Sequence, residues 1–317
     1  MLKINLSSTA LDRLVKRHSR YMLKLIKKRL SRTENAFLTS YFSSDKLIIQ
    51  VLNNPSDNLV DLSEQITKKL LALPISVLNV HNALKRTFSP SRFFDKKTPK
   101  YNAYHLCDSL GLKTCPYCNI MPISTIITWR PKTYVLRPPL DHFFAATLYP
   151  MLAISFFNLV PSCEVCNSRF KHKAKTGHLT HLNPYVDGFN DDCVFSFSGY
   201  KHIDDILAPN AKKYKLSLRN LKKDVRFDGN SNLFKLDLMY GHHADNAKIT
   251  LHQARKYSGA QIRSIKKLAI GSGMDPYQYA FDAKFKLEEL HEQPFSKLKR
   301  DIVNQFGSAA LKMELGI

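Results

Sequence analysis

Two Cys-x2-Cys pairs constrain the fold of this chain more than any other feature of its sequence. They are Cys115 with Cys118 and Cys163 with Cys166. Thiolates bind zinc tightly, and two such pairs a few tens of residues apart can surround one tetrahedral ion. The spacing therefore predicts one structural zinc site. The chain has 6 cysteines, and we expect the other two, Cys107 and Cys193, to be small buried thiols in a reducing compartment.

The length and charge of the chain indicate how many lobes it can form and which class of partner it can bind. A chain of 317 residues can form two or three lobes, because single cores stop growing near ~250–300 residues. Lys and Arg outnumber Asp and Glu by 48 to 26, which gives a net charge of +22 and favours a polyanionic partner. Nucleic acid is the first candidate. A membrane partner is not expected, since we find neither a lipidation signal nor an amphipathic helix with exposed large apolar residues.

The apolar segments predict a protein without membrane spans. The N-terminus lacks the continuous apolar stretch of a signal peptide. The longest apolar run, Leu148 to Val160, is interrupted by polar residues and is too short for a bilayer of ~30 Å. We therefore expect a soluble, cytoplasmic protein.

Periodicity divides the chain into three parts. Residues 1–100 are expected to form a basic, helical N-terminal lobe, which begins with an amphipathic helix from Ser7 to about Arg32. The basic face of this helix could contact a phosphate backbone or could simply be solvated. Residues 198–317 are expected to form a helical C-terminal lobe, and residues 101–197 carry the motifs. The predicted fold class is α+β and mainly helical.

The middle part is predicted to contain two strands followed by a helix. Residues 123–128 and 134–136 are β-branched or aromatic and are separated by a turn signal. Asp141 and His142 fall just past the second strand, where a loop would allow both side chains to serve one site. Residues 166–175 have the composition of a short basic helix.

Four polar residues near the cysteines are suited to hydrolysis of a phosphodiester. His142 can accept a proton from water at neutral pH. The carboxylate of Asp141 and the amide oxygen of Asn167 are ligands that suit Mg²⁺ or Mn²⁺. Asn158 is placed by spacing to orient the imidazole or the local backbone. Each residue alone is weak evidence, and the order and spacing together carry the hypothesis.

Over about Cys115 to Lys171 the sequence resembles the zinc-knuckle branch of the HNH endonucleases. The resemblance lies in the two cysteine pairs, in Leu140-Asp-His, in Asn158-Leu-Val, and in Asn167 directly after the last cysteine. It implies a ββα-metal finger in which His142 is the general base, Asp141 and Asn167 bind the catalytic ion, and Asn158 is the middle Asn of the motif. It also implies that Cys115, Cys118, Cys163 and Cys166 hold a structural zinc.

Four basic residues follow the last cysteine pair. They are Arg169, Lys171, Lys173 and Lys175. Their place beside the motif favours contacts with nucleic-acid phosphates over a merely solvated basic face. Such contacts give affinity without sequence choice.

The flanks carry a fainter resemblance to larger bacterial HNH proteins. The segments concerned are residues 182–185, 239–243 and 257–258. Several of those relatives act in anti-phage defence systems of the Septu and retron type, and this resemblance implies an ATPase partner.

The sequence therefore favours a metal-dependent endonuclease that cuts DNA in preference to RNA. The alternative is a non-catalytic zinc-ribbon module that binds nucleic acid or a partner protein. A zinc hydrolase is the least favoured hypothesis, because four sulfur ligands leave no open position on the zinc for water.

Overall fold

The computed structural model of the chain is a mixed α/β structure in which helices predominate, as expected. It describes residues 1–317 except 32–35, 96–100, 131, 173, 209–213 and 271–275. The chain forms two compact units, each assembled from separate stretches of sequence. Unit 1 contains residues 1–4, 113–122 and 187–317, and unit 2 contains residues 5–112 and 123–186. The predicted functional division into residues 1–100, 101–197 and 198–317 stays a prediction.

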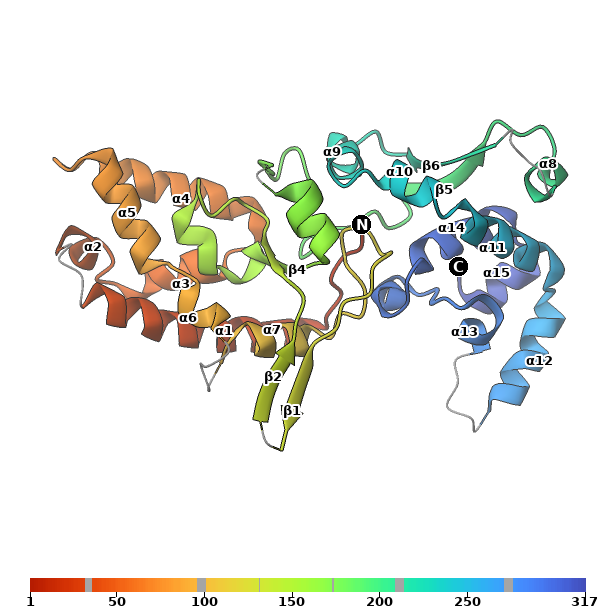
Figure 1. Cartoon of the computed structure of the whole chain (residues 1–317), viewed down its shortest axis with the longest axis horizontal. Coiled ribbons are helices and arrows are strands. Elements are labelled where there is room, and N and C mark those ends of the chain that lie inside the picture. Colours follow the sequence, from red (N-terminus) through yellow and green to blue (C-terminus); the bar gives the residue numbers. More distant parts are fainter. Residues whose placement is uncertain (32–35, 96–100, 131, 173, 209–213, 271–275) are drawn as a thin grey trace. The chain divides into compact units, whose positions relative to one another are not determined.

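The longest helix of unit 2 is α1, Ser8–Leu30, drawn in red in Figure 1. Ser7 caps its start, because the Ser7 hydroxyl accepts a hydrogen bond from the Ala10 N–H. Its apolar side, which includes Met22 and Ile26, is buried against the helices α3, α5 and α7. The predicted amphipathic helix is thus confirmed to within two residues at each end.

The remaining helices of unit 2 follow α1 in the sequence, and α3, α5, α7 and η2 pack against it. The described residues include the further α-helices α2 (Ala36–Tyr41), α3 (Asp45–Asn53), α4 (Ser56–Leu71), α5 (Val77–Thr87), α6 (Ser91–Phe94) and α7 (Ala103–Leu110). Two short 3₁₀ helices, η1 (Pro150–Ile154) and η2 (Phe156–Asn158), and a π-helix, η3 (Val165–Lys171), follow in the motif region.

Two small antiparallel sheets lie in the described part of unit 2. β1 (Ile126–Trp129) pairs with β2 (Lys132–Leu136), so the predicted hairpin is confirmed with slightly shifted ends. β3 (Leu140–His142) pairs with β4 (Leu159–Pro161), with Asp141 opposite Val160. Asp141 and His142 were expected in a loop, and this expectation was wrong. A three-residue strand has too little alternation to be read from sequence.

Unit 1 combines a hairpin with a helical layer. β5 (Cys193–Ser198) pairs with β6 (Lys215–Asn220), a sheet that the sequence did not predict. The helical elements are α8 (Ile203–Leu207), α9 (Val225–Leu233), α10 (Leu236–Gly241), α11 (Ala244–Lys256), α12 (Gly259–Ala269), α13 (Pro276–Phe281), η4 (Leu287–Glu292), α14 (Ser296–Phe306) and α15 (Ala309–Leu315). α14 packs on β5 and α11.

A buried ion pair lies inside unit 1. The Lys297 ammonium contacts the Asp301 carboxylate one turn further along α14, and both side chains are enclosed. Asp301 also accepts a hydrogen bond of 2.9 Å from the Phe195 N–H, which ties α14 to β5. Across the described residues, no helix has the length and apolar character that a membrane span requires.

Candidate active site and four-cysteine cluster

The His142 ring is fixed by one hydrogen bond to the backbone. Its Nε2 lies 3.0 Å from the carbonyl oxygen of Ala153 in η1. A carbonyl oxygen can only accept, so Nε2 carries the hydrogen and Nδ1 holds the unprotonated lone pair. Within the described part of the chain, Nδ1 has no hydrogen-bond partner. The ring is therefore held in the tautomer that a general base requires.

Burial sets the charge of this imidazole. Removal from water lowers the pKa of His142 below its ordinary value of 6.5, and the Lys171 ammonium acts in the same direction. The Ala153 carbonyl and the Asp141 carboxylate raise the pKa but offset the lowering only in part. His142 is consequently neutral at neutral pH, as a proton acceptor must be.

Asn158 supports the backbone beside His142. Its side chain is fully buried. The amide Nδ2 donates to the carbonyl oxygens of Phe144 and Leu152, at 3.1 and 2.8 Å, and Oδ1 accepts from the Phe144 N–H at 2.6 Å. Of the two roles left open by the sequence, the structure therefore shows contact with the local backbone.

Asp141 is engaged by Lys171 in a buried ion pair. The Lys171 Nζ lies 2.8 Å from Asp141 Oδ1, and the two side chains are 4% and 6% exposed, respectively. The same ammonium donates to the His142 carbonyl oxygen. Lys171 therefore points into unit 2, whereas the sequence had placed it on a surface that contacts phosphates. The carboxylate draws it inward, because a buried charge needs a partner.

Asn167 lies on η3, directly after Cys166. The π-helical geometry appears in the bond from the His172 N–H to the Asn167 carbonyl, 2.9 Å long and five residues apart. The Asn167 side chain is partly exposed, and its Nδ2 lies 3.3 Å from Ser168 Oγ. Arg169 and Lys175 are exposed, as phosphate contacts would be, and Lys173 lies outside the described residues.

One pocket brings four of the predicted site residues together. It has a volume of about 690 Å³. Its walls include Asp141, His142 and Asn167, together with Lys171 and Phe94. Asn158 does not line it. The pocket thus offers a neutral imidazole, a carboxylate, an amide oxygen and an ammonium, in a space large enough for a phosphodiester group.

Some of these neighbours had no clear signal in the sequence. Phe94 lies in α6, far from the motif, and its ring centroid is 6.0 Å from that of His142. Ala153 contributes through its backbone alone. The Thr176 hydroxyl donates to the Phe143 carbonyl and so holds the chain after η3 close to β3. Backbone partners of this kind have no residue-type signature.

The four motif cysteines form one cluster. Their sulfur atoms all lie within 4.8 Å of one another, and all four residues are buried. Tetrahedral zinc with Zn–S bonds of ~2.3 Å needs sulfurs roughly 3.8 Å apart, and this separation lies within the observed limit. The cluster can therefore bind a metal ion such as zinc.

Backbone hydrogen bonds to sulfur support this arrangement. The Ile120 N–H donates to Cys118 Sγ and the Cys166 N–H donates to Cys163 Sγ, both at 3.4 Å. Such donors favour the charged thiolate. By contrast, burial raises the pKa of Cys107 and of Cys193 to about 12, which agrees with their expected place as inert buried thiols.

Comparison of the chain with protein-family models, with curated proteins and with solved structures identified no match.

Proposed function

We propose that this protein is a metal-dependent endonuclease that hydrolyses phosphodiester bonds with His142 as the general base. The observation that carries the proposal is the His142 ring. Its Nε2–H donates to the Ala153 carbonyl oxygen, so its Nδ1 can accept a proton. The pocket around the ring is also lined by Asp141 and Asn167. The resemblance of the motif to the HNH endonucleases supports the same assignment.

The chemistry assigned to His142 is a single proton transfer. Nδ1 takes a proton from a water molecule, and the hydroxide attacks phosphorus while the bond to the 3′ oxygen breaks. The leaving 3′ oxygen then takes a proton from solvent water. The products carry a 5′-phosphate and a 3′-hydroxyl. Asn158 acts as a positioning residue, because it fixes the backbone that follows His142.

Asp141 and Asn167 are the residues that would hold a catalytic Mg²⁺ or Mn²⁺. A carboxylate and an amide oxygen are the donors these ions prefer. When bound, the ion would neutralise charge that develops on the leaving oxygen. Lys171 competes for the same carboxylate at 2.8 Å, so ion binding at Asp141 requires this ammonium to share or release it.

That ion pair also favours a second candidate function. A Lys171 ammonium that permanently saturates Asp141 would leave a non-catalytic zinc module that binds nucleic acid or a partner protein. We prefer the nuclease, because the module leaves the tautomer of His142 and the composition of the pocket without a purpose. DNA is the preferred substrate over RNA, and action in anti-phage defence with an ATPase partner rests on the family resemblance alone.

The test is a cleavage assay with plasmid DNA, single-stranded DNA and total RNA, with Mg²⁺ or Mn²⁺ at low salt. The His142→Ala variant should cut about 10²–10⁴-fold more slowly, the usual contribution of a general base. His81→Ala, a partly exposed histidine of α5 outside the pocket, is the matched control and should cut like the wild type. Cleavage retained in His142→Ala would reject the assigned base, and tight binding without cleavage would favour the module.

We propose zinc as the ion of the four-cysteine cluster. Elemental analysis should find one zinc per chain, and Cys163→Ser should lose it and unfold the surrounding segment, because the binding free energy of a structural zinc is folding free energy. Cys107→Ser is the control, because Cys107 is buried outside the cluster. A soluble Cys163→Ser variant of unchanged stability would show that the four cysteines do not form one metal site.

A further inference from the structure

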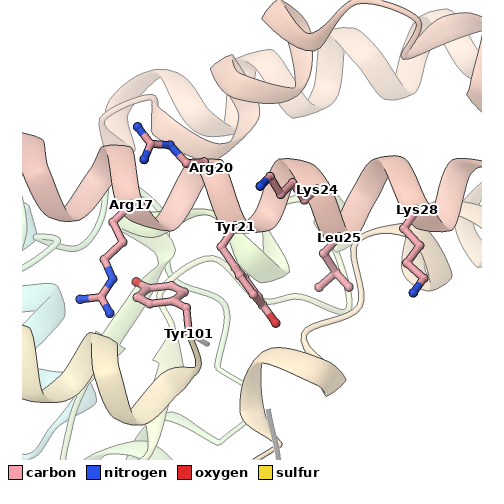
Figure 2. Close-up of a pocket in the computed structure, with 7 residues that line it drawn as sticks. All are labelled: Arg17, Arg20, Tyr21, Lys24, Leu25, Lys28 and Tyr101. Atoms are coloured by element: carbon pink, nitrogen blue, oxygen red, sulfur yellow. The ribbon is translucent and has the colours of Figure 1, made fainter. Parts of the chain in front are cut away.

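A second hollow of unit 2 lies along α1, away from the residues assigned to the chemistry. It has a volume of about 350 Å³ and is lined by Arg17, Arg20, Tyr21, Lys24, Leu25, Lys28 and Tyr101. Figure 2 shows Arg17, Tyr21, Leu25 and Lys28 leaving α1 on the side of Tyr101. We call this hollow the α1 groove. The proposed mechanism gives it no role.

The charged residues that line the α1 groove are all basic. Four of its described lining residues are cations and none is acidic. Arg17, Arg20, Lys24 and Lys28 are exposed and follow one another at steps of three, four and four residues, so they form one stripe along the helix. At 1.5 Å per residue the stripe covers ~16 Å, the axial length of roughly five nucleotides of one DNA strand.

The floor of the groove is aromatic and apolar. The rings of Tyr21 and Tyr101 meet with their centroids 5.6 Å apart, and Leu25 lies next to them. The Arg17 guanidinium sits over the Tyr101 ring, 5.0 Å from its centroid. A cationic rim above an aromatic floor is the combination that holds single-stranded nucleic acid, since the cations contact the backbone and a base stacks on a ring.

A chain of rings connects the groove with the His142 pocket inside unit 2. Tyr101 contacts Phe93 with centroids 5.7 Å apart, and Phe93 contacts Phe94 at the same distance. Phe94 in turn lines the pocket and lies 6.0 Å from the His142 ring. A strand bound in the groove is therefore within a short reach of the pocket.

We propose that the α1 groove binds a single-stranded segment of the nucleic-acid substrate, with the phosphates on the cationic stripe and one base on the Tyr21 ring. This inference rests on the proposed nuclease function and adds to it the form of the substrate near the site. Duplex DNA would have its bases already stacked and could use the stripe alone.

The test measures binding of fluorescent oligonucleotides in the His142→Ala background without added divalent ions. The groove variant carries Arg20→Gln, Lys24→Gln and Lys28→Gln. The control variant carries Lys46→Gln, Lys69→Gln and Lys85→Gln, which removes the same charge from exposed positions of unit 2 outside the groove. For a single strand, the slope of log affinity against log salt should fall by about 2 in the groove variant. Equal slopes in both variants would overturn the proposal.

A second substitution tests the aromatic floor. Tyr21→Ala should weaken binding of a single strand by about fivefold or more, the loss of one stacked base, and should leave duplex binding nearly unchanged. Equal losses for both substrates would refute base stacking in the groove. Binding to anionic phospholipid vesicles in preference to oligonucleotides would overturn the proposal as well. The cleavage assay reports separately on the nuclease, so a groove that fails here leaves that conclusion to its own test.

Discussion

Two histidines of unit 2 are anchored in the same way and differ in what they can do. His18 in α1 and His142 in β3 each place Nε2 against a carbonyl of η1, His18 on Ile154 at 2.8 Å and His142 on Ala153 at 3.0 Å. Burial is the main cause that lowers the pKa of both rings, to about 4 for His18. One short 3₁₀ helix therefore fixes two neutral imidazoles in the same tautomer.

The two histidines differ at the other ring nitrogen, Nδ1. His18 is fully enclosed, and its Nδ1 lies 3.3 Å from the Tyr101 hydroxyl, which must donate because Nε2 holds the ring hydrogen. His142 is partly exposed to the pocket, and its Nδ1 has no such donor among the described residues. The lone pair of His18 Nδ1 is already occupied by a hydrogen bond, whereas that of His142 Nδ1 faces a pocket and is available to accept a proton, as the proposed base requires.

The most direct test of the difference between the two histidines is to remove each ring. His18→Ala should lower the free energy of unfolding by about 3–5 kcal/mol, the range for emptying the site of a buried aromatic ring. The ring is packed edge-on against Phe93 and Phe156, with centroids 5.3 and 5.6 Å away. His142→Ala should cost no more than about 1 kcal/mol, because that ring borders a pocket. Urea denaturation of both variants gives the numbers, and equal losses would remove the distinction.

The free energy of unfolding should fall at acid pH because of the titration of His18. Unfolded His18 takes up a proton below pH 6.5, but the folded protein resists until about pH 4. The unfolded state thus binds more protons in this window, so stability is present above pH 6.5 and is lost as the pH falls toward 4. The loss assigned to His18 is about 3 kcal/mol, at 1.36 kcal/mol for each pH unit.

The check replaces His18 by Gln, which can still donate to the Ile154 carbonyl but does not titrate. The stability advantage of the wild type over His18→Gln should shrink by about 3 kcal/mol between pH 6.5 and pH 4. His81→Gln serves as the control for a partly exposed histidine. Parallel stability curves for wild type and His18→Gln would show that the pKa of His18 is the same in the folded and the unfolded protein, and would refute the lowered value.

The sequence predicted the parts of this arrangement that have a local pattern. The periodicity of α1 and the spacing of the cysteines were sufficient, because helix faces and metal ligands impose fixed intervals. The sequence also indicated which functional groups Asp141, His142 and Asn167 would contribute, and these three residues line one pocket.

The remainder depends on contacts between distant residues. Nothing near Lys171 indicates that it pairs with Asp141, 30 positions earlier in the chain. The carbonyls of Ala153 and Ile154 belong to residues without a functional side chain, so their part in fixing two imidazoles appears only in the folded structure. The hairpin of β5 and β6 was missed because its two strands are separated by 16 residues that include a helix.

The smallest expected effect isolates the bond that distinguishes His18. Tyr101→Phe keeps the ring and removes the hydroxyl that donates to His18 Nδ1, so the free energy of unfolding should fall by about 1 kcal/mol. Tyr104→Phe is the matched control, because the Tyr104 hydroxyl makes no hydrogen bond with the described residues. In a His18→Ala background the Tyr101→Phe change should lose its cost, since the acceptor is gone. An undiminished cost in that double variant would mean that the hydroxyl acts elsewhere, and the occupied lone pair would no longer explain why His18 is structural.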